Sequence, residues 1–515
     1  MIHTIIYFAN APNRSFSFPW SNGMPSAFWP TKARPNLVII YADDLGWKDL
    51  SCYGSTFYET PNLDRLAKEG IQFRNGYASA PVCSPSRASL MTGKYPVKTD
   101  VTDWLRGRQA DGKARPYEQM IAKPIADQLA LAEKTFAELA LENGYRTFSA
   151  GKWHLGEQEQ FWPEAQGFQV NKGGTNKGSP VGYKNDSTGG FFTPYLNPRL
   201  ADGPPGEYLT DRLTDECLNF LQQQKEAPFV LVYSLYAVHN PLQAPRALVE
   251  KYQQKQRQMG IQPDQLFRKN EPWMAFEAGW KQRTVQSNPV YAAMLENMDY
   301  NVGRILDQLA ASGLAENTIV LFTSDNGGLS TAEGSPTTND PLRAGKGWLY
   351  EGGIRVPVIM RWPAKIAAGQ ISDVPVNTID FYPTFANAIR QSTQKDQDVD
   401  GEDILKLIAR PGPAKKRAMY WHYPHYSNQG GKPGSAIIQH PFKLIYNHED
   451  QSIELYNLAS DIGETNNLAQ VKPAIAKKLQ HKLQGWLTQV KAKFPDKNPA
   501  YLDSSLGSSK GQDDR

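Results

Sequence analysis

The chain has 515 residues, more than one hydrophobic core normally supports, so a large domain and a smaller one are expected. Its 56 Lys and Arg nearly balance 52 Asp and Glu, and the absence of a long basic run or a nucleic-acid-binding motif argues against nucleic acid as a partner. The longest apolar run, residues 229–238, is far shorter than the roughly 18 residues of a membrane span, so none is predicted.

Residues 1–34 have little periodicity and are predicted to form an N-terminal arm. A short apolar patch at residues 5–9 has no Lys or Arg before it, so it is not a convincing signal peptide. From residue 35, apolar runs at 36–41, 145–150, 229–238 and 318–323 alternate with helical patterns at 61–69, 135–143, 208–224 and 290–311. This alternation predicts an α/β fold with a large, mainly parallel sheet sandwiched by helices over residues 35–410.

The pattern changes in the last fifth of the chain. Short strand-like runs at 419–423, 436–438, 442–446 and 453–458 precede a helical pattern at 475–493. They predict a small C-terminal domain with an antiparallel sheet over residues 411–500. The Ser-, Gly- and Asp-rich tail 501–515 is predicted to be disordered.

Oxygen-bearing side chains follow two of the predicted strands. Asp43 and Asp44 come after the first strand, and Asp325 and Asn326 follow residues 318–323. Each pair alone could belong to an ordinary turn, and Asn326-Gly327 is also a hairpin signal. Since parallel strands bind ligands at their carboxyl ends, the two pairs together predict a site for Ca²⁺ or Mg²⁺.

Two other strand ends carry basic or titratable side chains. Lys152 and His154 follow residues 145–150, and if the chain stays extended there both side chains point to one face. His239 follows residues 229–238, just before Pro241. A single His more often has a structural role, but the convergence of two favours a functional site.

Cys83 lies in the segment Cys83-Ser84-Pro85-Ser86-Arg87. Ser84-Pro85 predicts the start of a helix and Gly93 its end, so Cys83 is expected just before a helix N-terminus, with Arg87 one turn along. An isolated Cys is commonly a buried inert thiol. The chain has only three, Cys52, Cys83 and Cys217, too few and odd in number for a disulfide framework, so at least one thiol is available for other chemistry.

The segment from Cys83 to Arg87 resembles the Cys-x-Pro-x-Arg signature of type I, formylglycine-dependent sulfatases, which are arylsulfatase-like members of the alkaline phosphatase superfamily. It continues with the usual Ala-Ser-Leu-Met-Thr-Gly. The resemblance also covers residues 36–46, 60–70, 144–156, 239–241, 324–328, 341–357 and 454–468.

This resemblance implies an alkaline-phosphatase-like fold and a maturation enzyme, either the formylglycine-generating or the anaerobic type, that oxidises Cys83 to formylglycine. It implies one Ca²⁺ ion, held by Asp43, Asp44, Asp325, Asn326 and residue 83. Arg87 would hold residue 83, and Lys152, His239 and Lys346 would contact the sulfate. His239, with or without Lys346, would be the acid that protonates the leaving alcohol, and His154 the base that releases sulfate from residue 83.

The expected substrate is a sulfated carbohydrate, and family analogy predicts a periplasmic or secreted enzyme. Candidate substrate-binding residues outside the motifs are Asp103, Arg106, Arg108, His422 and His425. Arg could pair with a uronate or a second sulfate. Equally, the Arg side chains could be solvated loop charges, and the His residues could pack between the domains.

Two alternatives remain open from sequence. A phosphodiesterase or phosphonate hydrolase of the same fold would also stabilise a tetrahedral anionic centre beside a metal. A non-catalytic glycan-binding relative would not need the complete set of Cys83, Lys152, His154, His239 and Lys346 that the chain carries. The sulfatase interpretation is favoured because no further Asp- and His-rich segment suggests a second metal site.

Overall fold

The computed structural model describes residues 34–109, 111–115, 118–181, 189–224, 227–262, 265–269, 281–390 and 398–501. Except for Arg34 and Tyr501, the predicted N-terminal arm and C-terminal tail lie outside the described residues.

Eight strands of the described residues form the large sheet, in the order β12-β2-β11-β10-β1-β7-β5-β6. They are β1 (Asn36–Ala42), β2 (Ile71–Phe73), β5 (Arg146–Gly151), β6 (Val170–Lys172), β7 (Phe229–Ser234), β10 (Thr318–Ser324), β11 (Val358–Arg361) and β12 (Gln370–Ser372). Central β1 pairs in parallel with β10 and β7, whereas β11 is antiparallel to its neighbours. The predicted mainly parallel sheet is confirmed.

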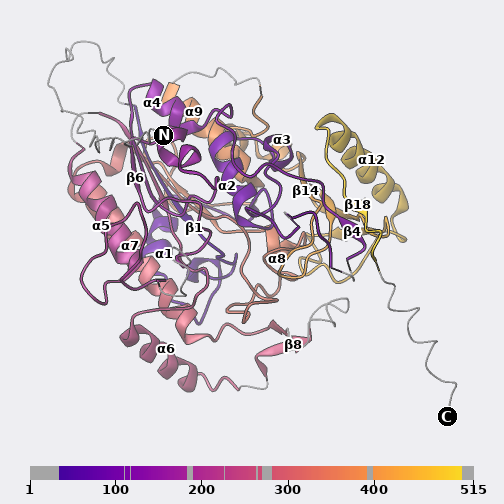
Figure 1. The fold of residues 1–515 in the computed structure, drawn as a ribbon, viewed down its shortest axis with the longest axis horizontal. Coiled ribbons are helices and arrows are strands. Elements are labelled where there is room, and N and C mark those ends of the chain that lie inside the picture. Colours follow the sequence, from indigo (N-terminus) through magenta and orange to yellow (C-terminus); the bar gives the residue numbers. More distant parts are fainter. Residues whose placement is uncertain are drawn as a thin grey trace, which may run out of the picture. The chain divides into compact units, whose positions relative to one another are not determined.

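Helices cover both faces of this sheet (Figure 1). One face packs against α1 (Pro61–Glu69), α5 (Leu209–Gln222), α6 (Arg246–Gln258) and α7 (Pro289–Ala311), and the other against α2 (Cys83–Thr92), α4 (Phe136–Glu142) and α9 (Phe381–Arg390). Alternate β1 residues supply the two cores: Val38 and Ile40 face the first group, and Leu37 and Ile39 the second. A strand buried on both faces explains the unbroken apolar run at 36–41.

The predicted small antiparallel sheet is also present. Its strands are β14 (Ala418–Tyr423), β15 (Gly434–Gln439), β16 (Phe442–Asn447) and β17 (Ile453–Asn457), each paired with the next, and α12 (Pro473–Gln489) packs on it. Buried Lys443 of β16 pairs with Glu351 at 3.0 Å and Glu464 at 2.8 Å. These contacts connect the small sheet to the loop that carries Lys346.

The remaining α-helices and strands of the described residues are short. They are α3 (Pro96–Thr99), α8 (Glu351–Ile354), α10 (Ile404–Ala409), α11 (Pro411–Ala414), β3 (Gly76–Tyr77), β4 (Met120–Ile121), β8 (Phe267–Lys269), β9 (Lys281–Arg283), β13 (Val376–Asn377) and β18 (Asp496–Lys497).

The strand predicted at 229–238 is shorter in the structure, because β7 ends at Ser234. The apolar run continues to residue 238 because the chain after β7 stays buried beside the end of β1. There the Leu235 N–H donates to the Tyr41 carbonyl at 2.9 Å, and the Val238 N–H donates to that of Asp43 at 2.8 Å. The apolar residues at 235–238 correctly predicted that this segment is buried, but they did not predict where the strand ends.

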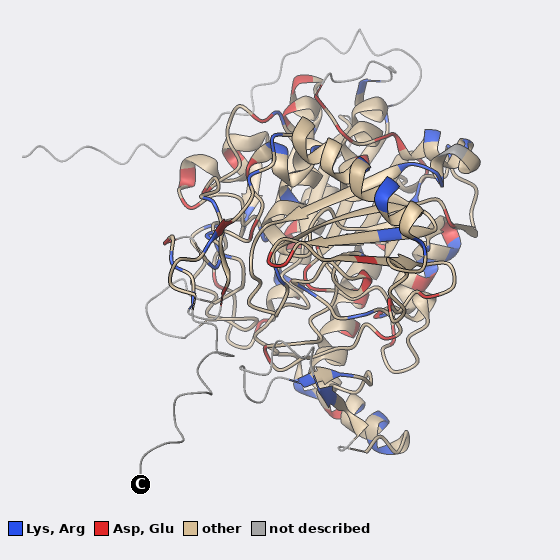
Figure 2. Ribbon diagram, turned by 90° about the vertical axis from the view of Figure 1, so that its right-hand side faces the viewer, with Lys and Arg blue, Asp and Glu red and all other residues tan. Residues whose placement is uncertain are grey.

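No helix of the described residues is long and apolar enough to cross a membrane. In the view of Figure 2, basic and acidic positions are interspersed along the ribbon. Many of them pair, such as Lys251 with Glu59 at 2.6 Å and Arg65 with Asp307 at 2.7 Å.

Candidate active site

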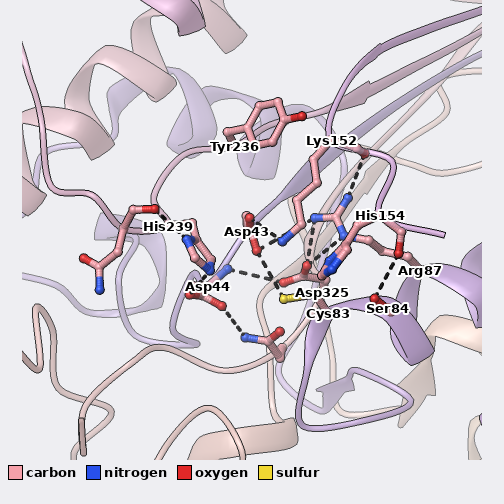
Figure 3. A network of polar contacts seen from close by, with 12 residues as sticks. Asp43, Asp44, Cys83, Ser84, Arg87, Lys152, His154, Tyr236, His239 and Asp325 are labelled. Carbon is pink, nitrogen blue, oxygen red and sulfur yellow. Dashed lines mark hydrogen bonds and ion pairs between the residues drawn. The ribbon is translucent and has the colours of Figure 1, made fainter. Parts of the chain in front are cut away.

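The ends of β1 and β10 bring the predicted carboxylates together. Ala42 is the register partner of Ser324, so the residues that follow each strand lie side by side. One ligand atom from each of Asp43, Asp44, Asp325 and Cys83 lies within 4.8 Å of the others, and all four residues are buried (Figure 3). The strand-end pattern in the sequence therefore locates a single cluster.

Three cationic side chains contact these carboxylates. Lys152 Nζ lies 2.7 Å from Asp43, and Lys346 Nζ lies 2.8 Å from Asp44. Arg87 donates to Asp325 Oδ2 from Nε at 3.0 Å and from Nη2 at 2.7 Å. Three carboxylates are thus balanced by three cations, so an added divalent cation would make the site net positive and suited to an anion.

The pKa values of the two adjacent aspartates are displaced in opposite directions. Burial raises the pKa of Asp43 to about 8; Lys152 opposes this shift, while the charges of Asp325 and Asp44 add to it. Burial would also raise the pKa of Asp44, but Lys346 and His239 hold that pKa below its ordinary value. A cation bound between the carboxylates would lower the cost of keeping Asp43 ionised.

Asn326 offers an oxygen that the protein leaves unused. Its Nδ2 donates to Asp44 Oδ1 at 2.8 Å and to the Gly327 carbonyl at 3.0 Å, whereas its buried Oδ1 has no hydrogen-bond partner among the described residues. Carboxylate and amide oxygens suit a hard cation such as Ca²⁺ or Mg²⁺. The Cys83 thiol, 3.7 Å from Asp43 Oδ1, is a soft group and does not suit such an ion.

Helix α2 begins at Cys83, one residue before the start predicted at Ser84. Gly93, with φ of 68°, ends the helix as predicted. Ser84 Oγ donates to the His154 carbonyl at 2.9 Å and accepts the Leu105 N–H at 3.1 Å, which fixes the helix start to two loops. Burial raises the pKa of the Cys83 thiol to about 12, so the unmodified thiol stays protonated at neutral pH and is a poor nucleophile.

His154 is positioned with one free ring nitrogen. Its Nε2 donates to the Leu105 carbonyl at 2.8 Å, which places the proton on Nε2, and its buried Nδ1 has no partner among the described residues. Burial and the charge of Lys152 hold the pKa of His154 well below its ordinary value. The ring is therefore neutral, with an unprotonated and unpaired Nδ1.

The backbone around His154 differs from the expected extended chain. His154 has a left-handed conformation with φ of 58°, so Lys152 and His154 are not on one face of a strand, although both reach the site (Figure 3). A Cβ added to Gly178 would lie 2.6 Å from His154 Cε1. The absence of a side chain at residue 178 is what leaves room for the imidazole.

His239 is less favourably set for its predicted acid role. Its Nδ1 donates to the Asn240 carbonyl at 2.7 Å, and its Nε2 lies 3.6 Å from Asp44. With protein groups alone, burial and Lys346 lower the pKa of His239 to about 3, although Asp44 opposes the shift. The ring is then neutral, so an acid role requires the negative charge of a bound ester to raise the pKa.

A pocket of about 370 Å³ opens above Cys83. Its predicted members are Cys83, His154, His239 and Lys346, and its further lining residues are Trp104, Leu105, Glu157, Asn176, Lys177, Gly178, Ser179, Glu333, Asn428 and Gln429. Trp104 and Leu105 lie between two of the candidates named from sequence, Asp103 and Arg106. The others lie in loops without a recognisable motif, and sequence reasoning missed them.

The structure does not gather the predicted specificity residues around this pocket. Exposed Arg106 lines a separate cavity of about 420 Å³ together with Asp103 and His425. Buried Asp103 accepts from the Tyr423 hydroxyl at 2.9 Å, and His425 Nε2 lies 2.8 Å from Thr102 Oγ1. Their substrate-binding roles stay predictions.

Arg108 and His422 also make contacts within the protein. Arg108 binds buried Glu118 at 2.8 Å and donates to Asn428 Oδ1 at 3.2 Å. His422 lies 2.8 Å from Ser435 Oγ and donates to the Lys493 carbonyl at 3.0 Å, inside the small-sheet region. Arg108 thus contacts the pocket lining at Asn428.

Comparison with known proteins identifies relatives over nearly the whole chain. The profile of the family described as Sulfatase matches residues 35–390, and that of N-sulphoglucosamine sulphohydrolase, C-terminal, matches residues 344–493. A sulfatase of Formosa agariphila is 32% identical over 526 residues, covering 88% of this chain and 89% of the relative. The N-acetylgalactosamine-6-sulfatase of Mus musculus is 30% identical and covers 75% of this chain and 68% of its own length.

Among solved structures, Ps i-CgsB in complex with k-i-k-neocarrahexaose is similar, with a TM-score of 0.69 and 28% identity. The match covers 92% of this chain and 96% of that one.

Proposed function

Because this chain belongs to the sulfatase family, we propose that it removes sulfate from a sulfated carbohydrate, using a formylglycine made from Cys83 and one Ca²⁺ ion. The observation that carries the proposal is the position of Cys83, at the start of α2 among three buried carboxylates and beneath a pocket. The relatives named for N-acetylgalactosamine 6-sulfate hydrolysis and solved with k-i-k-neocarrahexaose support a sugar substrate.

The mismatch between a soft thiol and hard oxygen donors supports modification of Cys83. An oxygen-bearing side chain at this position would join Asp43, Asp44, Asp325 and Asn326 in a uniform oxygen site for Ca²⁺. We propose that a maturation enzyme oxidises the thiol before the enzyme acts. The hydrated aldehyde would then supply the nucleophilic hydroxyl, and Ca²⁺, when bound, would favour its ionised form and offset charge on the sulfate.

The cationic side chains around residue 83 have two tasks. Lys346, with Lys152 behind it, provides positive charge for the sulfate oxygens. Arg87 holds Asp325 through two hydrogen bonds and thereby fixes one wall of the cation site. Both contacts exist before substrate binds, so little rearrangement is needed during the reaction.

Proton transfers are assigned to the two histidines. His154 accepts a proton at its unpaired Nδ1 while the Leu105 carbonyl holds its other nitrogen in place. His239 faces the pocket beside Asp44 and donates to the departing sugar oxygen once the bound anion has raised its pKa. Lys346 is the second candidate for that donation.

A sulfate-release screen tests this function. Protein in which formylglycine at residue 83 has been verified by mass spectrometry is incubated with defined sulfated mono- and oligosaccharides, and with the matching phosphate esters. We expect sulfate release from at least one sugar and much slower phosphate release. Faster phosphate release would favour a phosphodiesterase or phosphonate hydrolase, and no release of either would favour a non-catalytic glycan-binding protein.

A further inference from the structure

The two ends of the pocket carry different charges. Lys346 and His239 lie at the inner end beside Cys83, whereas the carboxylates of Glu157 and Glu333 lie among the remaining lining residues. Among the described residues that line this outer part, Lys177 is the one cation. The outer pocket therefore has a net negative charge, opposite to what a second sulfate would need.

Glu333 is held in place from two directions. Its main-chain carbonyl accepts from Asn240 Nδ2 at 3.2 Å, and its Oε1 accepts from Gln429 Nε2. The second carboxylate oxygen has no hydrogen-bond partner among the described residues. Glu333 also has φ of 52°, a left-handed conformation that is unfavourable for a residue with a Cβ.

Gln429 is itself rigidly fixed. Only 5% of it is exposed, its Oε1 accepts from Ser427 Oγ at 2.6 Å, and its carbonyl accepts from Trp348 Nε1 at 2.9 Å. With Oε1 occupied as an acceptor, its NH₂ group must face Glu333. The small-sheet region thereby orients a carboxylate that lies after β10.

The opposite wall is more nearly neutral. Glu157 accepts from Asn176 Nδ2 at 3.2 Å, and Lys177 forms no ion pair with another described residue. Any second anionic group on a bound sugar would thus meet one cation on this side. On the other side it would meet the Glu333 carboxylate, which forms no ion pair with a described residue although its charge also acts on Lys346.

We propose that Glu333 is a specificity-determining residue that restricts the pocket to a sugar carrying one sulfate, with hydroxyl groups directed toward Glu333. The inference rests on the proposed sulfatase function and names the substrate class of the same site. The free carboxylate oxygen accepts a hydrogen bond from a sugar hydroxyl. A second sulfate or a uronate carboxylate at that position is repelled by the like charge.

The charge effect can be separated from a loss of structure by an isosteric variant. Glu333→Gln removes the charge but can keep the acceptor for Gln429, and Glu333→Asp keeps the charge. Glu316→Gln is the matched control, because Glu316 is exposed near the start of β10, at the opposite end of the strand from the site. Each variant is assayed on paired mono- and disulfated methyl hexosides that share the cleaved sulfate, and on a singly charged aryl sulfate.

We expect the wild-type protein to favour the monosulfated sugar, and Glu333→Gln to reduce that kcat/KM ratio at least about 5-fold, as removal of one partly screened like charge should. Glu333→Asp and Glu316→Gln should retain the ratio. Because Glu333 is exposed, the wild-type preference should also weaken as salt rises above about 0.1 M, where screening acts over about 10 Å.

A wild-type preference for the disulfated sugar, or a ratio unchanged by Glu333→Gln, would overturn this inference while aryl sulfate hydrolysis remained intact. Loss of both sugar and aryl sulfate hydrolysis in the wild-type protein would instead overturn the proposed function, and this inference with it.

Discussion

The inner site around Cys83 and the outer part of the pocket, or pocket mouth, are built in different ways. At the inner site, Asp43, Asp325 and Lys152 are almost completely buried and come from the ends of paired strands. At the mouth, Glu333 and Asn428 belong to loops from distant parts of the chain and are partly or fully exposed. The sheet thus fixes the geometry of the inner site, whereas loops that can vary independently surround the pocket mouth.

The largest effect on activity is expected from substitutions of residue 83 at the inner site. We expect Cys83→Ala, and also Cys83→Ser, to lower sulfate release at least about 1,000-fold, because neither variant offers the thiol that the proposed maturation step oxidises to the aldehyde. Residual sulfate release is measured by ion chromatography alongside a thermal melt. Full activity in either variant would remove the inner site as the source of the chemistry.

Asn326→Ala tests the unpaired amide oxygen. Loss of one oxygen ligand should weaken Ca²⁺ binding on the order of 10- to 100-fold, seen as a smaller Ca²⁺-induced rise in melting temperature after chelation. Asn428→Ala, an amide change at the mouth, is the control and should keep the full rise. Equal shifts in the two variants would mean that Asn326 does not bind the ion.

His239→Ala separates acid catalysis from binding. Since a sugar oxygen leaves poorly without a proton, sugar sulfate turnover should fall about 100-fold or more, while an activated aryl sulfate should lose less than about 10-fold. The two substrates are compared by kcat/KM. Equal losses would argue against His239, and the same selective pattern in Lys346→Ala alone would assign the acid to that residue.

Changes at the mouth should have the smallest effect. A double variant, Arg108→Ala with Glu118→Gln, releases Asn428 without leaving a buried carboxylate unpaired, and should raise KM roughly 3- to 10-fold with kcat nearly unchanged. His425→Ala, which changes a residue outside the pocket, should leave the glycan kinetics within about twofold. A large fall in kcat from the double variant would show that the mouth also controls the chemistry.

Much of the inner site could be predicted from sequence, because the residues that bind ligands in a parallel sheet follow the carboxyl ends of its strands. Asp44 and Asp325 follow apolar runs, and parallel register places such residues at one edge. The left-handed backbone at His154 could not be read this way, since its conformation depends on Gly178 and the surrounding loops.

The contacts at the pocket mouth could not be predicted from sequence, because they join residues that are distant along the chain or follow no local pattern. Glu333 and Gln429 are 96 positions apart and meet only because the small-sheet region packs beside the loop after β10. The substrate-binding role of Arg108 stays a prediction, but the sequence did not reveal that buried Glu118, 10 positions away, orients its side chain. No local pattern identifies either contact.

The most direct test of the proposed function relates the formylglycine content of residue 83 to sulfatase activity. Preparations that differ in the fraction of residue 83 present as formylglycine, measured by mass spectrometry of the peptide that contains it, are assayed for sulfate release from one sulfated sugar. If formylglycine is the nucleophile, kcat per total protein should rise in proportion to that fraction and approach zero as the fraction does. Sulfate release that is independent of the fraction would contradict the proposed function.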